Sequence, residues 1–344
     1  MTSERVRRWC RLLPRMLDQQ AISESGIIMI TALVVGAGAG LGAVFFRWLI
    51  KSVQTLAYQG MAGRTLNISD IYLLIIPAVG GAVYGALIYR FAREAKGHGV
   101  PEVMEAVAIH GGRIRPRVAV IKSLASAICI GTGGSVGREG PIAQIGSALG
   151  STVGQLLHLS DERMQNLVAC GAAGGIAATF NAPIAGSLFA LEVILGRLEV
   201  TYFGAVVISS VTAAVVAHAF EGGTFAFAVP QYTLNSPWEL PLYILLGMLA
   251  AIGAVIFIRL LYASEDLWNR VHLPEYIKPV AGGLLLGIIG ILSFKAADGW
   301  PRVFGVGYGS IGDVLFGRLA TEVVLALFIF KLLATVLTLG AGGS

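Results

Sequence analysis

Long stretches without a charged residue dominate this sequence and restrict what it can fold into. They cover residues 27–46, 72–89, 140–160, 164–191, 200–220 and 240–258, with shorter ones at 123–137, 279–294 and 332–344. Only 13% of the residues are charged and 56% are hydrophobic, whereas soluble domains carry about 25% charged residues. A membrane-spanning helix needs about 20 apolar residues. The pattern predicts a polytopic membrane protein and excludes a disordered chain, a secreted disulfide scaffold and most cytosolic enzymes.

Interruptions in these stretches predict helices that stop inside the membrane. The stretch 164–191 is too long for one span and contains Asn181-Ala182-Pro183. Asn is a good helix N-cap and Pro suits a first helical turn, so we expect one helix to end near Thr179 and another to begin near Asn181. Non-helical backbone at that depth must be buried or line a cavity. The predicted fold class is all-α, with broken and re-entrant helices.

Basic residues flank the apolar stretches, which is typical of the cytoplasmic side. They are Arg5, Arg7, Arg8, Arg11, Arg15, Arg90, Arg93, Lys96, Arg113, Arg115 and Arg117. We expect residues 1–25 to form a basic, cytoplasmic N-terminal segment of a multi-pass protein of the plasma (cell inner) membrane. These arginines carry no aromatic platform, so nucleic acid is not an expected partner. The three cysteines do not have the spacing of a disulfide framework or a metal site. The sequence also offers no nucleophile–base pair, so we do not expect an enzyme.

The two ends of the chain resemble each other in three segments that come in the same order. Residues 42–46 match 253–257, Pro77 and the glycines at 80, 81 and 85 match Pro279 and the glycines at 282, 283 and 287, and 122–135 match 331–344. The alternative explanation is shared membrane composition. Ordered matches favour a duplication, with a first membrane repeat at 26–220 and a second at 237–344. The first copy runs well beyond Ser135, so we expect the second, which stops at Ser344, to be incomplete. Repeats with broken helices are typical of transporters.

Two glycine-rich loops, at 97–101 and 131–141, are the candidate binding elements. Neither is a dinucleotide loop, because no strand precedes it. Each ends in a proline that suits the start of a helix, and the N–H groups and dipole at a helix N-terminus favour an anion. With the turn before Pro183, three helix starts could converge on one anion. That arrangement suits transport, where binding must be firm enough to enter and weak enough to leave.

Glu139 is the single residue most indicative of function. It lies between long uncharged stretches, and an ionisable group at the bilayer centre costs roughly 2.5–3.5 kcal/mol on insertion scales. Two interpretations stay open. Glu139 either forms a neutralising pair with Arg138, or it occupies an anion site, competes with the ion and leaves when protonated.

Residues 137–141 are identical to the GREGP signature of the CLC chloride channels and chloride/proton antiporters. Residues 97–101 resemble that family's GSGIP loop, and the segment from Asn181 to Glu192 is also similar. The resemblance implies a homodimer with one pore per subunit and two inverted repeats in lipid. It implies Glu139 as the gating glutamate, chloride or another small anion as transported ligand, and no cofactor. It implies an anion site formed by Gly97, His98, Gly99, Val100, Pro101, Gly137, Arg138, Gly140 and Pro141.

Three departures from the family pattern refine this expectation. His98 stands where the family usually has a serine, which affects anion preference and can add pH dependence near neutrality. Val193 stands where antiporters usually carry a second, proton-conducting glutamate, so the sequence favours a voltage-gated-type chloride channel, and Glu192 is expected to be structural. The chain ends where the family's third anion loop begins. The alternatives are a chloride/proton antiporter, which would also carry protons, and a non-conducting membrane scaffold.

Overall fold

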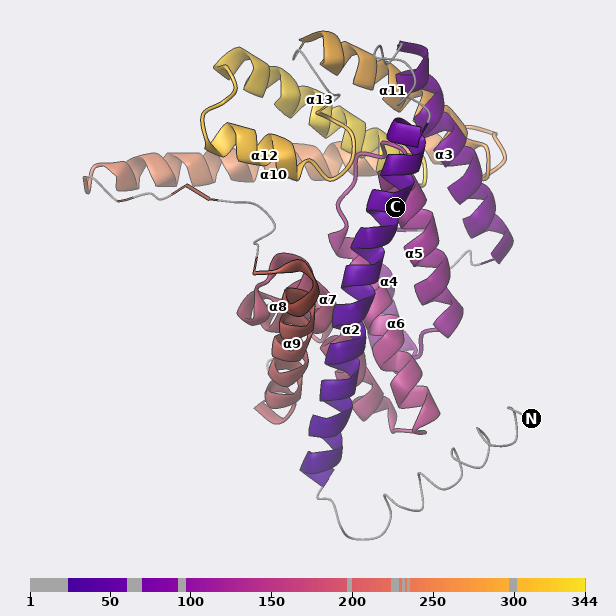
Figure 1. The fold of residues 1–344 in the computed structure, drawn as a ribbon, viewed down its shortest axis with the longest axis vertical. Coiled ribbons are helices and arrows are strands. Elements are labelled where there is room, and N and C mark those ends of the chain that lie inside the picture. The colour runs from indigo at the N-terminus through magenta and orange to yellow at the C-terminus, as the bar shows by residue number, and fades with distance from the viewer. Residues whose placement is uncertain are drawn as a thin grey trace. The chain divides into compact units, whose positions relative to one another are not determined.

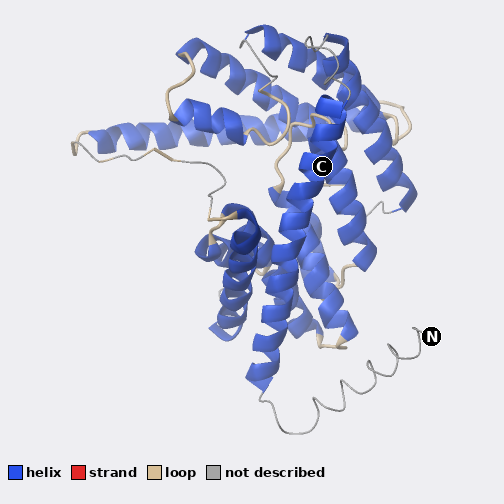
Figure 2. Ribbon diagram, in the orientation of Figure 1, coloured by secondary structure: helices blue, strands red, loops and turns tan. Residues whose placement is uncertain are grey.

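The computed structural model describes residues 24–60, 70–91, 97–196, 200–223, 229–230, 233, 236–296 and 302–343, and the regular elements in these ranges are helices (Figures 1 and 2). Six of the described helices are long and apolar enough to cross a membrane. The predicted all-α, broken-helix fold class is confirmed. The predicted basic segment 1–25 lies, except for its last two residues, outside the described residues. The elements are α2 (Glu24–Gln54), the π-helical η1 (Thr55–Gly60), α3 (Asp70–Phe91), α4 (Val100–Ile109), α5 (Pro116–Gly131), α6 (Glu139–Leu156), α7 (Asp161–Phe180), α8 (Pro183–Phe189), the π-helical η3 (Ala190–Ile194), α9 (Val200–Glu221), α10 (Glu239–Arg270), α11 (Lys278–Ala296), α12 (Tyr308–Leu315) and α13 (Thr321–Gly340).

The break in the long stretch 164–191 occurs where the sequence predicts it, but Asn181 has the opposite role. It does not cap the start of a helix. It ends α7 in the left-handed conformation, with φ of 54°, and its N–H donates to the carbonyl of Ala177. Ala182 is the N-cap of α8, and Pro183 is its first residue. Among non-glycine residues Asn tolerates the left-handed region well, which suits it to terminate a helix.

The chain divides into two compact units whose segments alternate along the sequence. The first unit comprises 1–47, 98–123 and 139–224, and the second comprises 48–97, 124–138 and 225–344. These units differ from the repeats at 26–220 and 237–344, which are defined by duplication and stay a prediction.

In the first unit, glycines let α6 and α7 touch backbone to backbone. A Cβ on Gly146 would lie 2.8 Å from the carbonyl carbon of Gly171, and one on Gly171 would lie 3.0 Å from the nitrogen of Ser147. Small residues at helix interfaces allow this close approach within a membrane. Arg47 of α2 closes the end of this bundle, since it donates to the Ala178 carbonyl at 2.6 Å and pairs with Glu221.

In the second unit, the repeat-related helices α3 and α11 pack against each other reciprocally (Figure 1). A Cβ on Gly81 would lie 2.6 Å from the carbonyl carbon of Pro279, and one on Gly283 would lie 2.6 Å from that of Pro77. Pro77 and Gly81 are the repeat counterparts of Pro279 and Gly283. Each proline therefore lies beside the other copy's glycine, so the two helices run antiparallel. This antiparallel contact is what inverted copies of the predicted duplication would give.

The loops after α5 and α13 also repeat, at the level of single hydrogen bonds. The N–H of Gly134 donates to the carbonyl of Cys129 at 2.7 Å, and the N–H of Gly343 donates to that of Thr338 at 2.8 Å. These residue pairs occupy matching positions in the segments 122–135 and 331–344. The duplicated glycine sequence therefore ends both helices in the same way.

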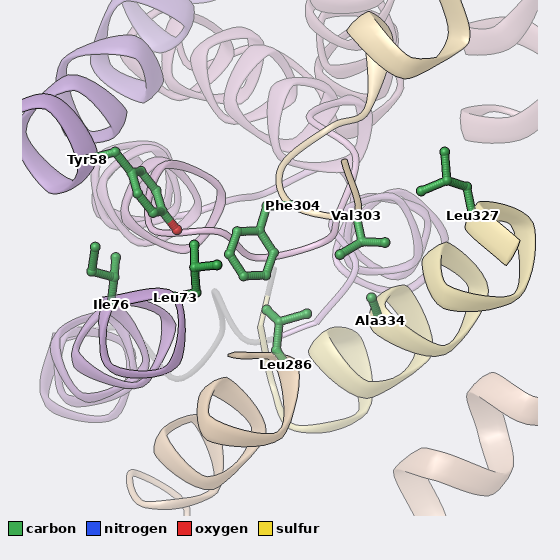
Figure 3. Close-up of a cluster of buried hydrophobic side chains, with 8 residues drawn as sticks. All are labelled: Tyr58, Leu73, Ile76, Leu286, Val303, Phe304, Leu327 and Ala334. Carbon is green, nitrogen blue, oxygen red and sulfur yellow. The ribbon is translucent and has the colours of Figure 1, made fainter. Parts of the chain in front are cut away.

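A buried apolar cluster in the second unit fixes the segment that leads into α12 (Figure 3). Phe304 lies at its centre, with Leu73 of α3, Leu286 of α11 and Val303 around it. Val303 is completely buried and Phe304 is 8% exposed. This packing positions the glycine loop that follows them. The cluster consists of Tyr58, Leu73, Ile76, Leu286, Val303, Phe304, Leu327 and Ala334.

The α3–α11 contact makes a direct prediction. We expect Gly81→Ala to lower the melting temperature of the detergent-solubilised protein, because its methyl group would overlap the Pro279 backbone and overpacking costs typically about 1–3 kcal/mol. Gly247→Ala in α10 is the matched control, because a Cβ there meets no atom within 4 Å. The control should keep or raise the melting temperature, since alanine favours a helix over glycine by about 1 kcal/mol. Equal melting temperatures for the two variants would contradict the close contact between Gly81 and the Pro279 backbone.

Candidate functional site

The first glycine loop ends where α4 begins, as the sequence predicts. Gly97 and Gly99 have φ of 123° and 97°, a region that glycine enters without steric cost. The N–H of Gly99 donates to the carboxylate of Glu102 at 2.7 Å, and Val103 donates to the Gly99 carbonyl at 3.3 Å. These bonds hold the loop in one conformation immediately before Val100, the first residue of α4.

The second glycine loop ends at Glu139, which is the first residue of α6. The starts of α4 and α6 touch within the first unit. A Cβ on Gly99 would lie 3.1 Å from the Cα of Gly140, and one on Gly140 would lie 3.2 Å from the carbonyl carbon of His98. Neither glycine has room for a side chain. The structure thus brings together two of the three helix starts that the sequence singles out.

The side chains of the predicted site differ in exposure. His98 and Glu139 are both half-buried, and Pro141 is buried. The third predicted helix start is at Pro183. Its carbonyl accepts hydrogen bonds from the hydroxyls of Ser187 at 2.9 Å and Ser210 at 2.6 Å. Its backbone oxygen is therefore engaged within α8 and with α9.

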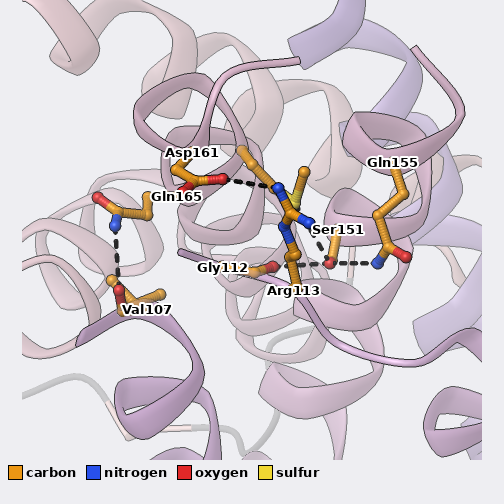
Figure 4. Close-up of polar contacts among 8 residues, drawn as sticks. Val107, Gly112, Arg113, Ser151, Gln155, Asp161 and Gln165 are labelled. Atoms are coloured by element: carbon orange, nitrogen blue, oxygen red, sulfur yellow. Dashed lines mark hydrogen bonds and ion pairs between the residues drawn. The ribbon is translucent and has the colours of Figure 1, made fainter. Parts of the chain in front are cut away.

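Hydrogen bonds also fix the far end of α4 (Figure 4). The Ser151 hydroxyl of α6 donates to the Gly112 carbonyl at 2.7 Å and accepts from the N–H of Ile114 at 2.8 Å. Gln155 donates to that hydroxyl at 2.9 Å and to the Ile114 carbonyl at 2.8 Å. Gln165 of α7 donates to the Val107 carbonyl at 3.0 Å. Helix α4 is therefore anchored at both ends.

Arg138 does not form the neutralising pair with Glu139 that the sequence left open. In the described ranges its guanidinium joins no ion pair, and its Nε is buried without a hydrogen-bond partner. The guanidinium carbon instead lies 4.8 Å from the ring centroid of Tyr308. The aromatic ring therefore holds the positive charge in place, and no carboxylate in the described ranges neutralises it.

The segment around Val193 is π-helical. Glu192 is exposed and Val193 is half-buried within η3. The assignment of Val193 as a non-acidic position on a proton route stays a prediction. Across the described ranges, no group of three or more His, Cys, Asp or Glu side chains could hold a metal ion.

A further glycine loop, at 305–307 and called the α12 loop below, precedes α12, and the sequence did not single it out. Gly305 and Gly307 have φ of 66° and 93°, and Gly307 is the N-cap of α12. Two glycines separated by one residue and followed by a helix repeat the arrangement of Gly97 and Gly99 before α4. The sequence does contain the same Gly-x-Gly spacing at 305–307 as at 97–99. The two glycines are the residues that the segments share, which is too little to identify a loop.

The α12 loop is held by Lys331, which matches Lys122 in the predicted duplication. The ammonium of Lys331 donates to the carbonyls of Val303 at 3.0 Å and Gly305 at 2.6 Å. Its repeat counterpart, Lys122, is completely buried. The loop borders a cavity of about 430 Å³ in the second unit, with Arg302, Ser310 and Asp313 on its wall.

Broken helices, antiparallel contact between the matched helices α3 and α11, and glycine loops at helix starts are typical of membrane transport proteins built from inverted repeats. The family described as "Voltage gated chloride channel" matches residues 80–344. The chain therefore belongs to this family, the CLC proteins, as the GREGP resemblance predicts. Membership makes it an integral, multi-pass membrane protein, and its relatives are transport proteins rather than enzymes.

Two curated relatives cover most of the chain. A ClcB-like protein of Ralstonia nicotianae, named as a candidate chloride channel protein, is 30% identical over 90% of this chain and 72% of its own length. An H⁺/Cl⁻ exchange transporter, ClcA, of Vibrio parahaemolyticus is 31% identical over 92% of this chain and 68% of its own length. The fold is similar to that of a slow cyanobacterial Cl⁻/H⁺ antiporter, with a TM-score of 0.80, 22% identity, and coverage of 94% of this chain and 75% of that one.

The anchoring of α4 makes a second prediction. We expect Ser151→Ala to lower the melting temperature, because it removes three hydrogen bonds and leaves the buried Ile114 N–H unsatisfied, at a cost of about 1–3 kcal/mol. Thr152→Ala is the control, since among the described residues the Thr152 hydroxyl bonds only the Ala148 carbonyl of its own helix. A Ser151 variant as stable as the Thr152 variant would show that this network does not hold α4.

Proposed function

We propose that this protein exchanges chloride, or a similar small inorganic anion, for protons across a membrane, with Glu139 as the gate. The ClcA relative is named as an exchanger, and this supports exchange over the simple channel that Val193 favours in the sequence. The proposal keeps the site residues predicted from the two glycine loops. Chloride is the transported ligand, and no further cofactor is invoked.

The observation that carries the proposal is the contact between Gly99 and Gly140. It places the N-termini of α4 and α6 together, and each helix N-terminus has an effective charge of roughly +0.5. Two helix N-termini together attract an anion, and because their charges are partial they do not bind it so tightly that it cannot leave. Binding of this kind is compatible with rapid release.

Glu139 gives the site its coupling to protons. As the first residue of α6, it carries its carboxylate at a helix start that favours negative charge. A chloride ion and an ionised Glu139 compete for the same backbone N–H groups. Proton uptake removes the negative charge of Glu139, so the carboxyl leaves and the anion enters. Return of Glu139 releases its proton, and an alternation of these steps exchanges the two ions.

The wider arrangement follows from the family. We propose a homodimer with one pore per subunit in the plasma (cell inner) membrane and with the N-terminus in the cytoplasm. The basic residues near the N-terminus support that orientation.

A chloride channel remains the second candidate, on one observation. Val193, half-buried in η3, offers no titratable group. A route that lacks this carboxylate needs water or another group to carry the proton.

The decisive experiment measures chloride efflux and proton movement together in proteoliposomes that contain the full chain. We expect an imposed chloride gradient to drive protons uphill. Chloride flow without stoichiometric proton movement would establish the channel, and absence of both would establish the non-conducting scaffold.

Glu139 variants test the gate in the same assay. We expect Glu139→Gln, which mimics the protonated form, to conduct chloride independently of external pH, and Glu139→Ala to abolish proton coupling. Glu105→Gln is the control, because Glu105 is an exposed carboxylate on α4, and it should behave like the unaltered protein. Coupling that survives in Glu139→Ala would refute the assignment of the gate.

His98 tests the anion preference. We expect His98→Ser to change the ratio of chloride to nitrate flux, because residue 98 lies in the loop between two left-handed glycines and adjoins the Gly99–Gly140 contact. A serine hydroxyl and an imidazole present different hydrogen-bonding groups to an anion. His110→Ser, at the far end of α4, is the control and should leave the ratio unchanged. An unchanged ratio in the His98 variant would exclude it as a selectivity residue.

A further inference from the structure

The guanidinium of Arg138 has an unusual environment for a charge beside a membrane site. It makes no ion pair in the described part of the chain, and its buried Nε has no hydrogen-bond acceptor. The guanidinium instead lies over the ring of Tyr308, with its carbon 4.8 Å from the ring centroid. A cation within about 6 Å of an aromatic face is attracted by the ring quadrupole. The ring orients the charge without neutralising it, unlike a carboxylate partner.

Tyr308 can hold this position because the segment on either side of it is fixed. It is the first residue of α12 and directly follows Gly307. On one side, Lys331 binds the carbonyls of Val303 and Gly305, and Phe304 is packed into the apolar cluster. These contacts therefore hold the backbone that carries the ring of Tyr308.

The other end of α12 is tied by ion pairs. Asp313 pairs with Arg302, and also with Arg318 at 3.4 Å. Hydrogen bonding and charge from Arg302, followed by those of Arg318, hold the pKa of the Asp313 carboxyl below its usual value. A lowered carboxyl pKa means that the pairs persist at neutral pH and are lost only as the pH falls through that lowered value. Helix α12 is thus tethered under the conditions in which transport is measured.

We infer that Tyr308 is a positioning residue for anion transport: its ring fixes the uncompensated charge of Arg138, the residue before Glu139, and so sets the affinity for the transported anion. The inference rests on the proposed function, since it assigns a purpose to Arg138 in an anion site. It also connects the α12 loop to the segment at 131–141, because α12 begins at the residue that contacts Arg138.

The physical basis is the long range of a charge that no carboxylate neutralises. A guanidinium that no carboxylate neutralises attracts an anion over a longer distance than a salt-bridged one does. Its effect on affinity depends on where it is held, because Coulomb energy falls with distance. Without the ring, the flexible side chain would spread over several rotamers, and the average attraction would fall.

Chloride titrations of transport, made with the full chain in proteoliposomes, test the inference. We expect Tyr308→Leu to raise the half-saturating chloride concentration by about threefold to tenfold, which corresponds to the loss of one cation–π contact. Tyr308→Phe keeps the ring and should retain the affinity of the unaltered protein. Because the maximal rate does not depend on this contact, it should change little in either variant.

Phe316→Leu is the matched control. Arg318 lies over the ring of Phe316 at 5.2 Å, so the same kind of contact is removed just beyond the end of α12. That pair is exposed, with 67% of the Arg318 side chain accessible, and it does not involve Arg138. The half-saturating chloride concentration should therefore be unchanged.

A double-mutant cycle tests whether Tyr308 acts through Arg138. Arg138→Gln should weaken chloride binding, and adding Tyr308→Leu to it should cause no further loss, because coupled residues are non-additive. Additive losses would overturn the inference, since Tyr308 would then act independently of the charge. A Tyr308→Phe variant as weak as Tyr308→Leu would also overturn it, because the hydroxyl would then matter more than the ring.

The two proposals fail differently. If the unaltered protein moves no chloride, the proposed function itself is refuted. If the unaltered protein transports chloride and Tyr308→Leu has the same half-saturating concentration, transport stands and only the role of Tyr308 is refuted.

Discussion

Contact between helix backbones at glycine is the interaction on which the rest of this structure depends. In each compact unit, glycines remove the side chains that would keep helices apart, at Gly146 and Gly171 between α6 and α7, and at Gly81 and Gly283 between α3 and α11. Within a membrane such contacts replace the hydrophobic driving force, because lipid tails are as apolar as leucine. The same rule applies at Gly99 and Gly140, where the backbones in contact belong to helix starts rather than helix middles.

Helix starts that meet in this way give an anion site whose charge is partial and is supplied by the backbone. The glycine loops supply N–H groups, the Glu102 carboxylate fixes one loop through the N–H of Gly99, and Glu139 and Arg138 add further charges. Neither of these is cancelled by the other, since Arg138 stacks on Tyr308. An anion that competes with a carboxylate for backbone donors, beside a charge oriented by an aromatic ring, can be bound and released without a trapping ion pair. That balance underlies the exchange we propose.

Several features were predictable from the sequence, because they depend on local chemistry. Uncharged stretches of span length predicted α2, α3, α9 and α10, and the prolines at 101 and 141 predicted helix starts close to Val100 and Glu139. The position of the break after α7 was also predicted, but the role of Asn181 was not. N-capping and left-handed termination both suit Asn, and only the path of the following chain selects between them. Helix α12 was missed because a short helix after a glycine loop has no periodic signal long enough to detect.

The sequence by itself determined the membrane class, the broken helices, the ordered internal matches and the family signature, since each follows from composition or from residue order. The tertiary structure decided what residue order does not encode. It made the matched helices α3 and α11 antiparallel through the Pro77–Gly283 and Gly81–Pro279 contacts. It also brought Gly99 to Gly140, and it gave Arg138 an aromatic partner instead of a carboxylate. These outcomes depend on which surfaces meet after the helices form, and side chains far apart in the sequence settle that together.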